Sequence, residues 1–197
     1  LLLAVACASA FGAAQNPIIT SSDVPNGLSS SPSANGVTLR GFREVAPLTW
    51  QQVSVQKHGG SSFTIPGGVI GVAGYNGFDQ SWGEGSRTLD NIGSNEKLRA
   101  DAAGKFTEVT INASIFATGP AYVVVTMFDG NTPVDSLTLP AVTGNNQNLV
   151  ISSASAFNRI EIGFPAGVAR NTVSGAILVG VNTVSYTHLT LPTILRV

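Results

Sequence analysis

The alternation of apolar and polar positions between Ala121 and Phe164 predicts consecutive β-strands. Tyr122–Phe128 (YVVVTMF) is an unbroken apolar, β-branched and aromatic run, which is typical of a strand buried on both faces. The stretch Asp129–Pro133 (DGNTP) predicts a turn, because Gly and Asn tolerate positive φ and Pro presets a bend. Three further strand segments follow, Ser136–Leu139, Leu149–Ser152 and Asn158–Phe164. We therefore expect an antiparallel meander.

The rest of the chain repeats this pattern of short strand-like segments. They are Val37–Phe42, Leu48–Lys57, Ser62–Ile65, Val69–Ala73, Leu98–Ala100, Phe106–Phe116 and Ala176–Val181. Turns rich in Gly, Pro and Asn separate them, and no segment of helical length has apolar residues at three-and-four spacing. The pattern predicts an all-β fold, an antiparallel two-sheet β-sandwich of jelly-roll or Ig-like type.

The first residues have the pattern of a secretory signal peptide. Leu1–Ala14 is short, apolar and ends in small residues, so it is too short to span a bilayer. Cys7 also allows a lipoprotein interpretation, but Ala4 stands where such signals usually have Leu. We expect a secreted protein, at the outer cell surface or outside the cell.

The last residues match a laboratory sequence. Val184–Thr193 (VSYTHLTLPT) is identical to the translation of a sequencing-library transposase adapter, and Thr183 fits the preceding adapter bases. We therefore expect residues 183–197 to be a non-native tail. The native C-terminus, with any membrane anchor that it carried, would then be missing.

Between these ends we expect a lead-in at residues 15–35, extended or flexible because it is rich in Ser, Asn, Pro and Gly, and one β-sandwich domain at residues 36–182. Charged residues make up 11% of the chain and hydrophobic residues 43%, which is too apolar for disorder. The net charge is −1, and no run of basic residues occurs, so nucleic acid is not an expected partner.

Cysteine and histidine chemistry is nearly excluded. Cys7 is the only cysteine and lies in the signal segment, so a disulfide or a cysteine metal site is not expected in the mature domain. With His188 in the tail, His58 is the only histidine left, and we interpret it as a solvated residue at a strand end.

The loop Gly74–Gly85 (GYNGFDQSWGEG) is the main candidate for ligand binding. Its aromatic rings offer apolar faces for a sugar ring, and its amides and carboxylates offer partners for hydroxyls. The candidate ligand-binding residues are Tyr75, Asn76, Asp79, Gln80, Trp82 and Glu84. The alternative is that the aromatic side chains, with Phe78, fold inward and cover one end of the sandwich.

A second loop carries the hard oxygen ligands that a structural Ca²⁺ prefers. The candidate metal-binding residues are Asp90, Asn91, Asn95 and Glu96. Asx residues beside Gly also form turns without a metal, and no other cofactor is indicated. Asp129, Asn131 and Asp135 allow the same metal interpretation, but a hairpin turn explains them better. Asn112-Ala113-Ser114 is a glycosylation sequon, relevant only in a eukaryotic secretory pathway.

The segment from about Val53 to Val181 resembles the secreted β-sandwich proteins of the PEP-CTERM type, the bacterial exosortase substrates. The likeness rests on GGVIGVAGYNG, TLDNIGSNEKLRAD, YVVVTMFDGN and FNRIEIGF. The Pro-Glu-Pro motif, apolar helix and basic tail that define the family are absent from the chain as it stands. The resemblance implies export and residence at the surface or in a biofilm matrix, and it provides no catalytic residues to carry over to this chain.

We therefore expect a non-enzymatic extracellular β-sandwich that binds polysaccharide in surface adhesion or a biofilm matrix. One alternative is a purely structural, self-associating surface subunit, since the chain has low charge and long apolar strands that can pair edge to edge. The other is a secreted glycan-acting enzyme, although no pair among the eleven acidic residues is marked as catalytic.

Overall fold

The computed structural model describes residues 16–58, 69–72, 96–116, 122–140, 144–163 and 178–187, and these form an all-β domain. The strands are β1 (Ile18–Thr20), β2 (Gly27–Ser29), β3 (Ser33–Ala34), β4 (Val37–Ala46), β5 (Thr49–Val53), β6 (Val55–His58), β7 (Val69–Val72), β8 (Glu96–Phe116), β9 (Tyr122–Asp129), β10 (Thr132–Pro140), β11 (Gly144–Gly163) and β12 (Leu178–Thr187). Within these residues the only helical element is the 3₁₀ turn η1 (Ser21–Asp23). The predicted all-β fold is confirmed.

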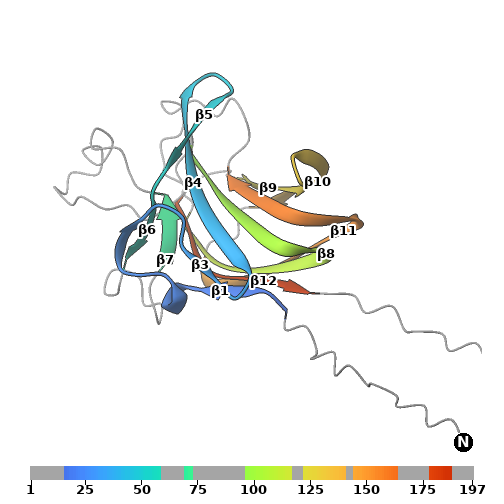
Figure 1. The fold of residues 1–197 in the computed structure, drawn as a ribbon, viewed down its shortest axis with the longest axis horizontal. Coiled ribbons are helices and arrows are strands. Elements are labelled where there is room, and N and C mark those ends of the chain that lie inside the picture. Colours follow the sequence, from blue (N-terminus) through green and yellow to red (C-terminus); the bar gives the residue numbers. More distant parts are fainter. Residues whose placement is uncertain are drawn as a thin grey trace, which may run out of the picture.

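Two long strands, β8 and β11, connect the two antiparallel layers of the sandwich (Figure 1). In the first layer the strand order is β10-β9-β11-β8-β4-β5, using the end of β11 and the beginning of β8. In the second layer the order is β11-β8-β12-β7-β6-β2, using the opposite halves of these two strands. One edge of β8 therefore passes from β4 to β12, and the layers form one hydrogen-bonded network.

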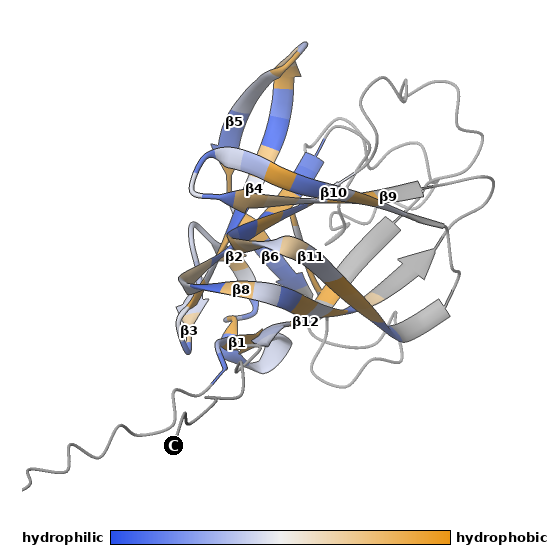
Figure 2. Cartoon of the chain, turned by 90° about the vertical axis from the view of Figure 1, so that its right-hand side faces the viewer, coloured by the Kyte–Doolittle hydropathy of each residue, from blue (hydrophilic) through white to orange (hydrophobic). Residues whose placement is uncertain are grey.

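The core lies between the layers, because successive residues of a strand point to opposite faces. Val109, Ile111 and Ala113 of β8 are buried, as their alternation with polar residues predicts. Ile160 and Ile162 of β11 are likewise buried, and Arg159 and Glu161 between them are partly exposed. In Figure 2 the strands accordingly change between hydrophobic and hydrophilic colours along their length.

The predicted meander is wrong in its second connection, from β10 to β11. β9 and β10 form the expected hairpin, but β11 pairs with the other edge of β9 and with β8. The physical reason is burial. Ile160 and Ile162 of β11 are buried against the second layer, so β11 lies inside the sheet, whereas Ser136, Leu137 and Thr138 of β10 are exposed, so β10 lies at its edge. The two segments predicted at 149–152 and 158–164 are also one strand, which bulges between Ser152 and Arg159.

Burial on both faces was predicted for Tyr122–Phe128, and this is wrong for the part whose side chains are described. Val125 and Met127 are buried, whereas Val124, Thr126 and Phe128 are half-buried on the outer face. An apolar run cannot distinguish a strand buried on both faces from one buried on a single face, because Val and Phe also suit a partly covered outer face.

The turn between β9 and β10 is confirmed. Thr132 pairs with Asp129, so Gly130 and Asn131 form a two-residue loop. Gly130 has φ of 61°, while Asn131 is not in the positive region, which is the pattern of a type II′ hairpin turn.

The structure extends the domain beyond both predicted boundaries. Residues expected in the lead-in form β1, β2 and β3, and Ile19 and Val24 are buried in the core. Strands of two or three residues are too short to show alternation in the sequence. At the other end, β12 continues past Asn182 to Thr187, pairs with β1 and β8, and buries Val184 and Tyr186.

Candidate functional site

Nine residues gather on the outer face of the first layer, and we name this surface the basic–aromatic face. It comprises Arg40, Phe42, Trp50, Lys97, Arg99, Asp101, Phe128, Arg159 and Glu161. The register explains why they share a face: directly opposite residues point the same way, and Arg40 pairs with Arg99, Phe42 with Lys97 and Asp101 with Arg159.

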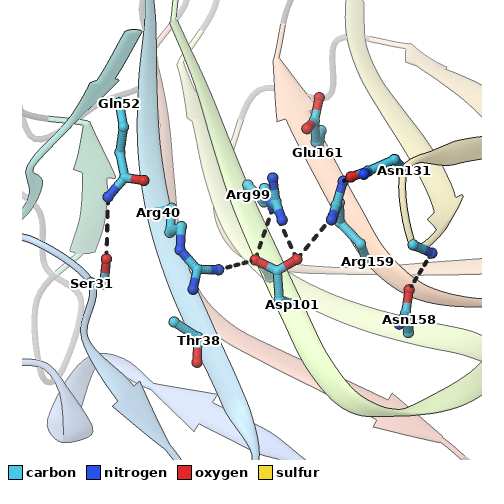
Figure 3. Close-up of polar contacts among 12 residues, drawn as sticks. Ser31, Thr38, Arg40, Gln52, Arg99, Asp101, Asn131, Asn158, Arg159 and Glu161 are labelled. Carbon is cyan, nitrogen blue, oxygen red and sulfur yellow. Dashed lines mark hydrogen bonds and ion pairs between the residues drawn. The ribbon is translucent and has the colours of Figure 1, made fainter.

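Asp101 lies at the centre of this face, where three guanidinium groups from three strands meet its carboxylate (Figure 3). Arg99 donates from Nε to both carboxylate oxygens at 2.9 Å, and Arg159 donates from Nε to Oδ1 at 2.9 Å. Arg40 donates from Nη1 to Oδ2. Arg159 also donates from Nη1 to the side-chain oxygen of Asn131, at 3.1 Å, in the β9–β10 turn.

The surroundings hold Asp101 in its charged form. Burial by itself raises the pKa of this carboxyl, but the hydrogen bonds from Arg99 and Arg159 and their positive charges outweigh it. The pKa of Asp101 therefore lies below its ordinary value, and the carboxylate stays ionised wherever the protein is folded near neutral pH.

Aromatic rings flank the cations. Nζ of Lys97 lies 4.2 Å from the ring centroid of Trp50 and 5.8 Å from that of Phe42. The guanidinium carbon of Arg99 lies 5.8 Å from the ring centroid of Phe42, and that of Arg159 lies 5.7 Å from the ring centroid of Phe128. These are cation–π distances, so each cation is held beside an apolar surface.

The face has more positive than negative charge. Arg40, Lys97, Arg99 and Arg159 carry one positive charge each, whereas Asp101 and Glu161 are acidic and Glu44, directly opposite Trp50, adds a third carboxylate at the edge of the face. Glu161 accepts from Nζ of Lys97 at 2.7 Å, so Asp101 and Glu161 are each paired with a cation. Chemically, the arrangement combines hydrogen-bond donors, net positive charge and ring surfaces.

A second ion pair points into the sandwich instead. Arg43 donates from Nε and Nη2 to Oε1 of Glu96, at 3.1 and 2.8 Å. The Arg43 and Glu96 side chains are only 14% and 9% exposed. Arg43 follows Leu39 and Gly41, and Glu96 precedes Leu98, on the inward positions of β4 and β8. The pair closes one end of the core.

One of the four predicted calcium ligands, Glu96, is paired with an arginine in the structure. Glu96 is engaged by Arg43, whereas Asp90, Asn91 and Asn95 lie outside the described residues. In the part of the chain that the structure describes, no three His, Cys, Asp or Glu residues form a group suited to a metal. Near the hairpin, Asp129 pairs with Lys105, and Asp135 accepts from the backbone N–H of Ser136. The calcium site stays a prediction.

The predicted sugar-binding loop lies entirely outside the described residues. This covers Tyr75, Asn76, Asp79, Gln80, Trp82 and Glu84, so their grouping stays a prediction.

His58 is the last residue of β6, which confirms its position at a strand end. Asn112 of the sequon lies in β8, where Nδ2 donates to Oδ1 of Asn148 at 2.7 Å.

Sequence reasoning missed the basic–aromatic face because its cations are far apart along the chain. Asp101 is 61 residues from Arg40 and 58 from Arg159. The available signal was the type of residue at the outward positions: Arg in TLRGF, Lys and Arg in EKLRAD, and Arg in NRIEIGF. These outward positions become neighbours only when β4, β8 and β11 are paired.

A search for helices that are long and apolar enough to cross a membrane finds none in the described parts of the chain. No protein-family model and no curated protein matches this sequence.

Proposed function

We propose that this protein is an extracellular, non-enzymatic β-sandwich that binds polysaccharide through its basic–aromatic face. The observation that carries the proposal is the convergence of cations and aromatic rings on one outer sheet face. Secretion is supported by the signal-like residues 1–14, and surface or matrix residence by the resemblance to PEP-CTERM proteins.

The chemistry of this face suits a sugar chain. A sugar ring has an apolar face of C–H groups, which packs on aromatic surface, and hydroxyl oxygens, which accept hydrogen bonds from guanidinium and ammonium groups. Trp50 is 37% exposed at the edge of the face, and Phe42 and Phe128 are half-buried. A rigid sheet holds these groups, which lowers the entropic cost of binding.

The chain offers a simple test because it has only two tryptophans, Trp50 and Trp82. Each is replaced in turn by Phe, and the emission of the remaining one is recorded during titration with soluble polysaccharides. We expect a change in emission in Trp82→Phe, which retains Trp50, and weaker retention of Trp50→Ala on insoluble polysaccharide at an unchanged melting temperature.

Other results contradict the proposal. A change in emission confined to Trp50→Phe, which retains Trp82, places binding in the 74–85 loop instead. Release of reducing sugar that disappears when one carboxylate is removed identifies an enzyme. Absence of binding to every glycan removes the function altogether.

A self-associating surface subunit is the second candidate, and the free edge of β11 favours it. In the described residues, β11 has no partner on the edge opposite β8 from Gln147 to Ala156. This stretch has neither charge nor proline, and Val150 is 59% exposed. Another edge strand, β10, is interrupted by Pro133 and a bulge, which are protective features. Light scattering that grows with concentration, without glycan binding, favours this candidate.

A further inference from the structure

We infer that the ligand of the basic–aromatic face is an acidic polysaccharide, whose carboxylates bind the guanidinium groups of Arg40, Arg99 and Arg159. This inference rests on the proposed function and adds the class of polysaccharide. It follows from two features of the face, its excess of positive charge and the N–H donors that its arginines retain.

The first feature is that the basic–aromatic face is positively charged, whereas the chain as a whole is negatively charged. The chain carries a net charge of −1, yet this face has a formal excess of one positive charge, from four cations and three carboxylates when Glu44 opposite Trp50 is counted. A neutral sugar makes no use of such an excess, whereas an anionic polymer is attracted by it.

The second feature is how Asp101 positions the guanidinium groups. Arg99 contacts Asp101 only through Nε, so neither of its Nη atoms donates to another described residue. Arg159 uses Nε and Nη1, and Arg40 uses Nη1 alone. Arg99 and Arg40 are therefore each held by Asp101 alone and retain further N–H groups, whereas Arg159 is held by Asp101 and Asn131 and retains Nη2. A planar fork of this kind matches a carboxylate in bidentate geometry.

The same features favour an acidic polysaccharide over a nucleic acid. Asp101 and Glu161 interrupt the cations, so the face lacks the continuous positive track that a phosphate backbone needs. Uronic acid residues place their carboxylates on separate rings, and Phe42, Trp50 and Phe128 supply apolar surface between the cations.

The test compares two polymers with one backbone. Polygalacturonate and its fully methyl-esterified form differ in charge and have the same sugar chain. Isothermal titration with the full chain should show binding of polygalacturonate at least about tenfold tighter than of the ester at low ionic strength. The difference should shrink as the salt concentration rises to roughly 1 M, because mobile ions screen exposed charges.

Two variants with opposite expected effects isolate the face. Arg99→Gln should weaken polygalacturonate binding about fivefold to tenfold, and Arg40 and Arg159 still hold Asp101 in this variant. Glu161→Gln should tighten binding about threefold, because it removes a carboxylate and releases Lys97. Lys57→Gln is the charge-matched control: Lys57 lies on β6 of the second layer and should leave the affinity unchanged.

Each remaining outcome contradicts a defined part of the account. Equal affinity for polygalacturonate and its ester overturns the acidic class but leaves polysaccharide binding intact. Absence of binding to these and to neutral polysaccharides overturns the proposed function itself. Binding of duplex DNA as tight as that of polygalacturonate overturns the choice of a glycan. Equal losses in Arg99→Gln and Lys57→Gln show that the effect is not located on this face.

Discussion

At the scale of single residues, Asp101 is the position on which the basic–aromatic face depends. Three arginines from three strands would repel one another if no anion lay between them. The carboxylate of Asp101 accepts hydrogen bonds from all three arginines, so it joins β4, β8 and β11 on their outer side. It also determines which N–H groups of each arginine remain for a ligand.

We predict that Asp101→Asn lowers the free energy of unfolding by about 1–2 kcal/mol at neutral pH, because three partly buried cations lose their counter-charge. The pKa of Asp101 is lowered in the folded state, so its stabilisation is present above the ordinary value of 3.8. It is lost as the pH falls through the lower, folded-state pKa. Denaturant unfolding from neutral pH to below pH 3.8 measures this, and the two proteins should converge at the acidic end.

Asp135→Asn provides the matched control. Asp135 is exposed on the edge strand and accepts only from the neighbouring backbone N–H of Ser136 among the described contacts. The same chemical change there should alter the free energy of unfolding by less than about 0.5 kcal/mol. Equal effects at the two positions, or a difference that grows toward acid, would contradict the role given to Asp101.

At the scale of strands, β12 carries a large part of the core. Val184 and Tyr186 are fully buried, and the Tyr186 ring lies 5.1 Å from Phe106 and 6.2 Å from Phe157. Its hydroxyl donates to the backbone oxygen of Ala100 at 2.8 Å. Burial, the largest cause, raises the pKa of Tyr186, so the hydroxyl stays protonated and remains a donor.

We predict that a chain ending at Asn182 is strongly destabilised relative to one ending at Thr187. The shorter chain loses Val184 and Tyr186, and β1 loses its only described partner strand, since Ile18–Thr20 pairs with residues 183–185. Loss of two large core side chains costs about 4–8 kcal/mol, comparable to the whole stability of many domains. Circular dichroism with thermal melting compares the two chains.

Equal melting temperatures for these two chains would contradict the structure of β12. This comparison also bears on the predicted adapter origin of residues 183–197. Even if those residues are foreign, residues 184–187 (VSYT) form the end of β12. They can do so because apolar and polar residues alternate there, as a strand with one buried face requires.

Strand identity and burial could be predicted largely from the sequence. The strand at Phe106–Phe116 and the turn within Asp129–Pro133 were correctly predicted, since alternation and turn chemistry are local. Strand order could not be predicted this way. The pattern of β11 shows which residues face the core but does not show that its neighbours are β8 and β9.

The candidate site was harder to predict for the same reason. The residues singled out in the sequence lie near one another along the chain, in loops at 74–85 and 90–96. The basic–aromatic face instead takes between one and three residues from each of five strands. Of the residues singled out in those two loops, only Glu96 is described, and it is committed to an inward ion pair with Arg43.

At the scale of the whole molecule, the two layers divide the surface into regions with different chemistry. The first layer presents the basic–aromatic face, with a paired cation beside each ring. The second layer presents an uncharged edge of β11, which pairs with no other strand among the described residues, and the exposed Val150. The proposed polysaccharide binding and the alternative of self-association would therefore use separate surfaces, and we expect mutation to remove one without the other.

The most direct test of the central claim is a map of backbone amide chemical shifts during titration with oligogalacturonate. We predict that the shifts concentrate on β4, β8 and β11 around Arg40, Arg99 and Arg159, and that the edge of β11 near Val150 is unaffected. Shifts concentrated in residues 74–85, or along residues 147–156, would contradict binding at the basic–aromatic face.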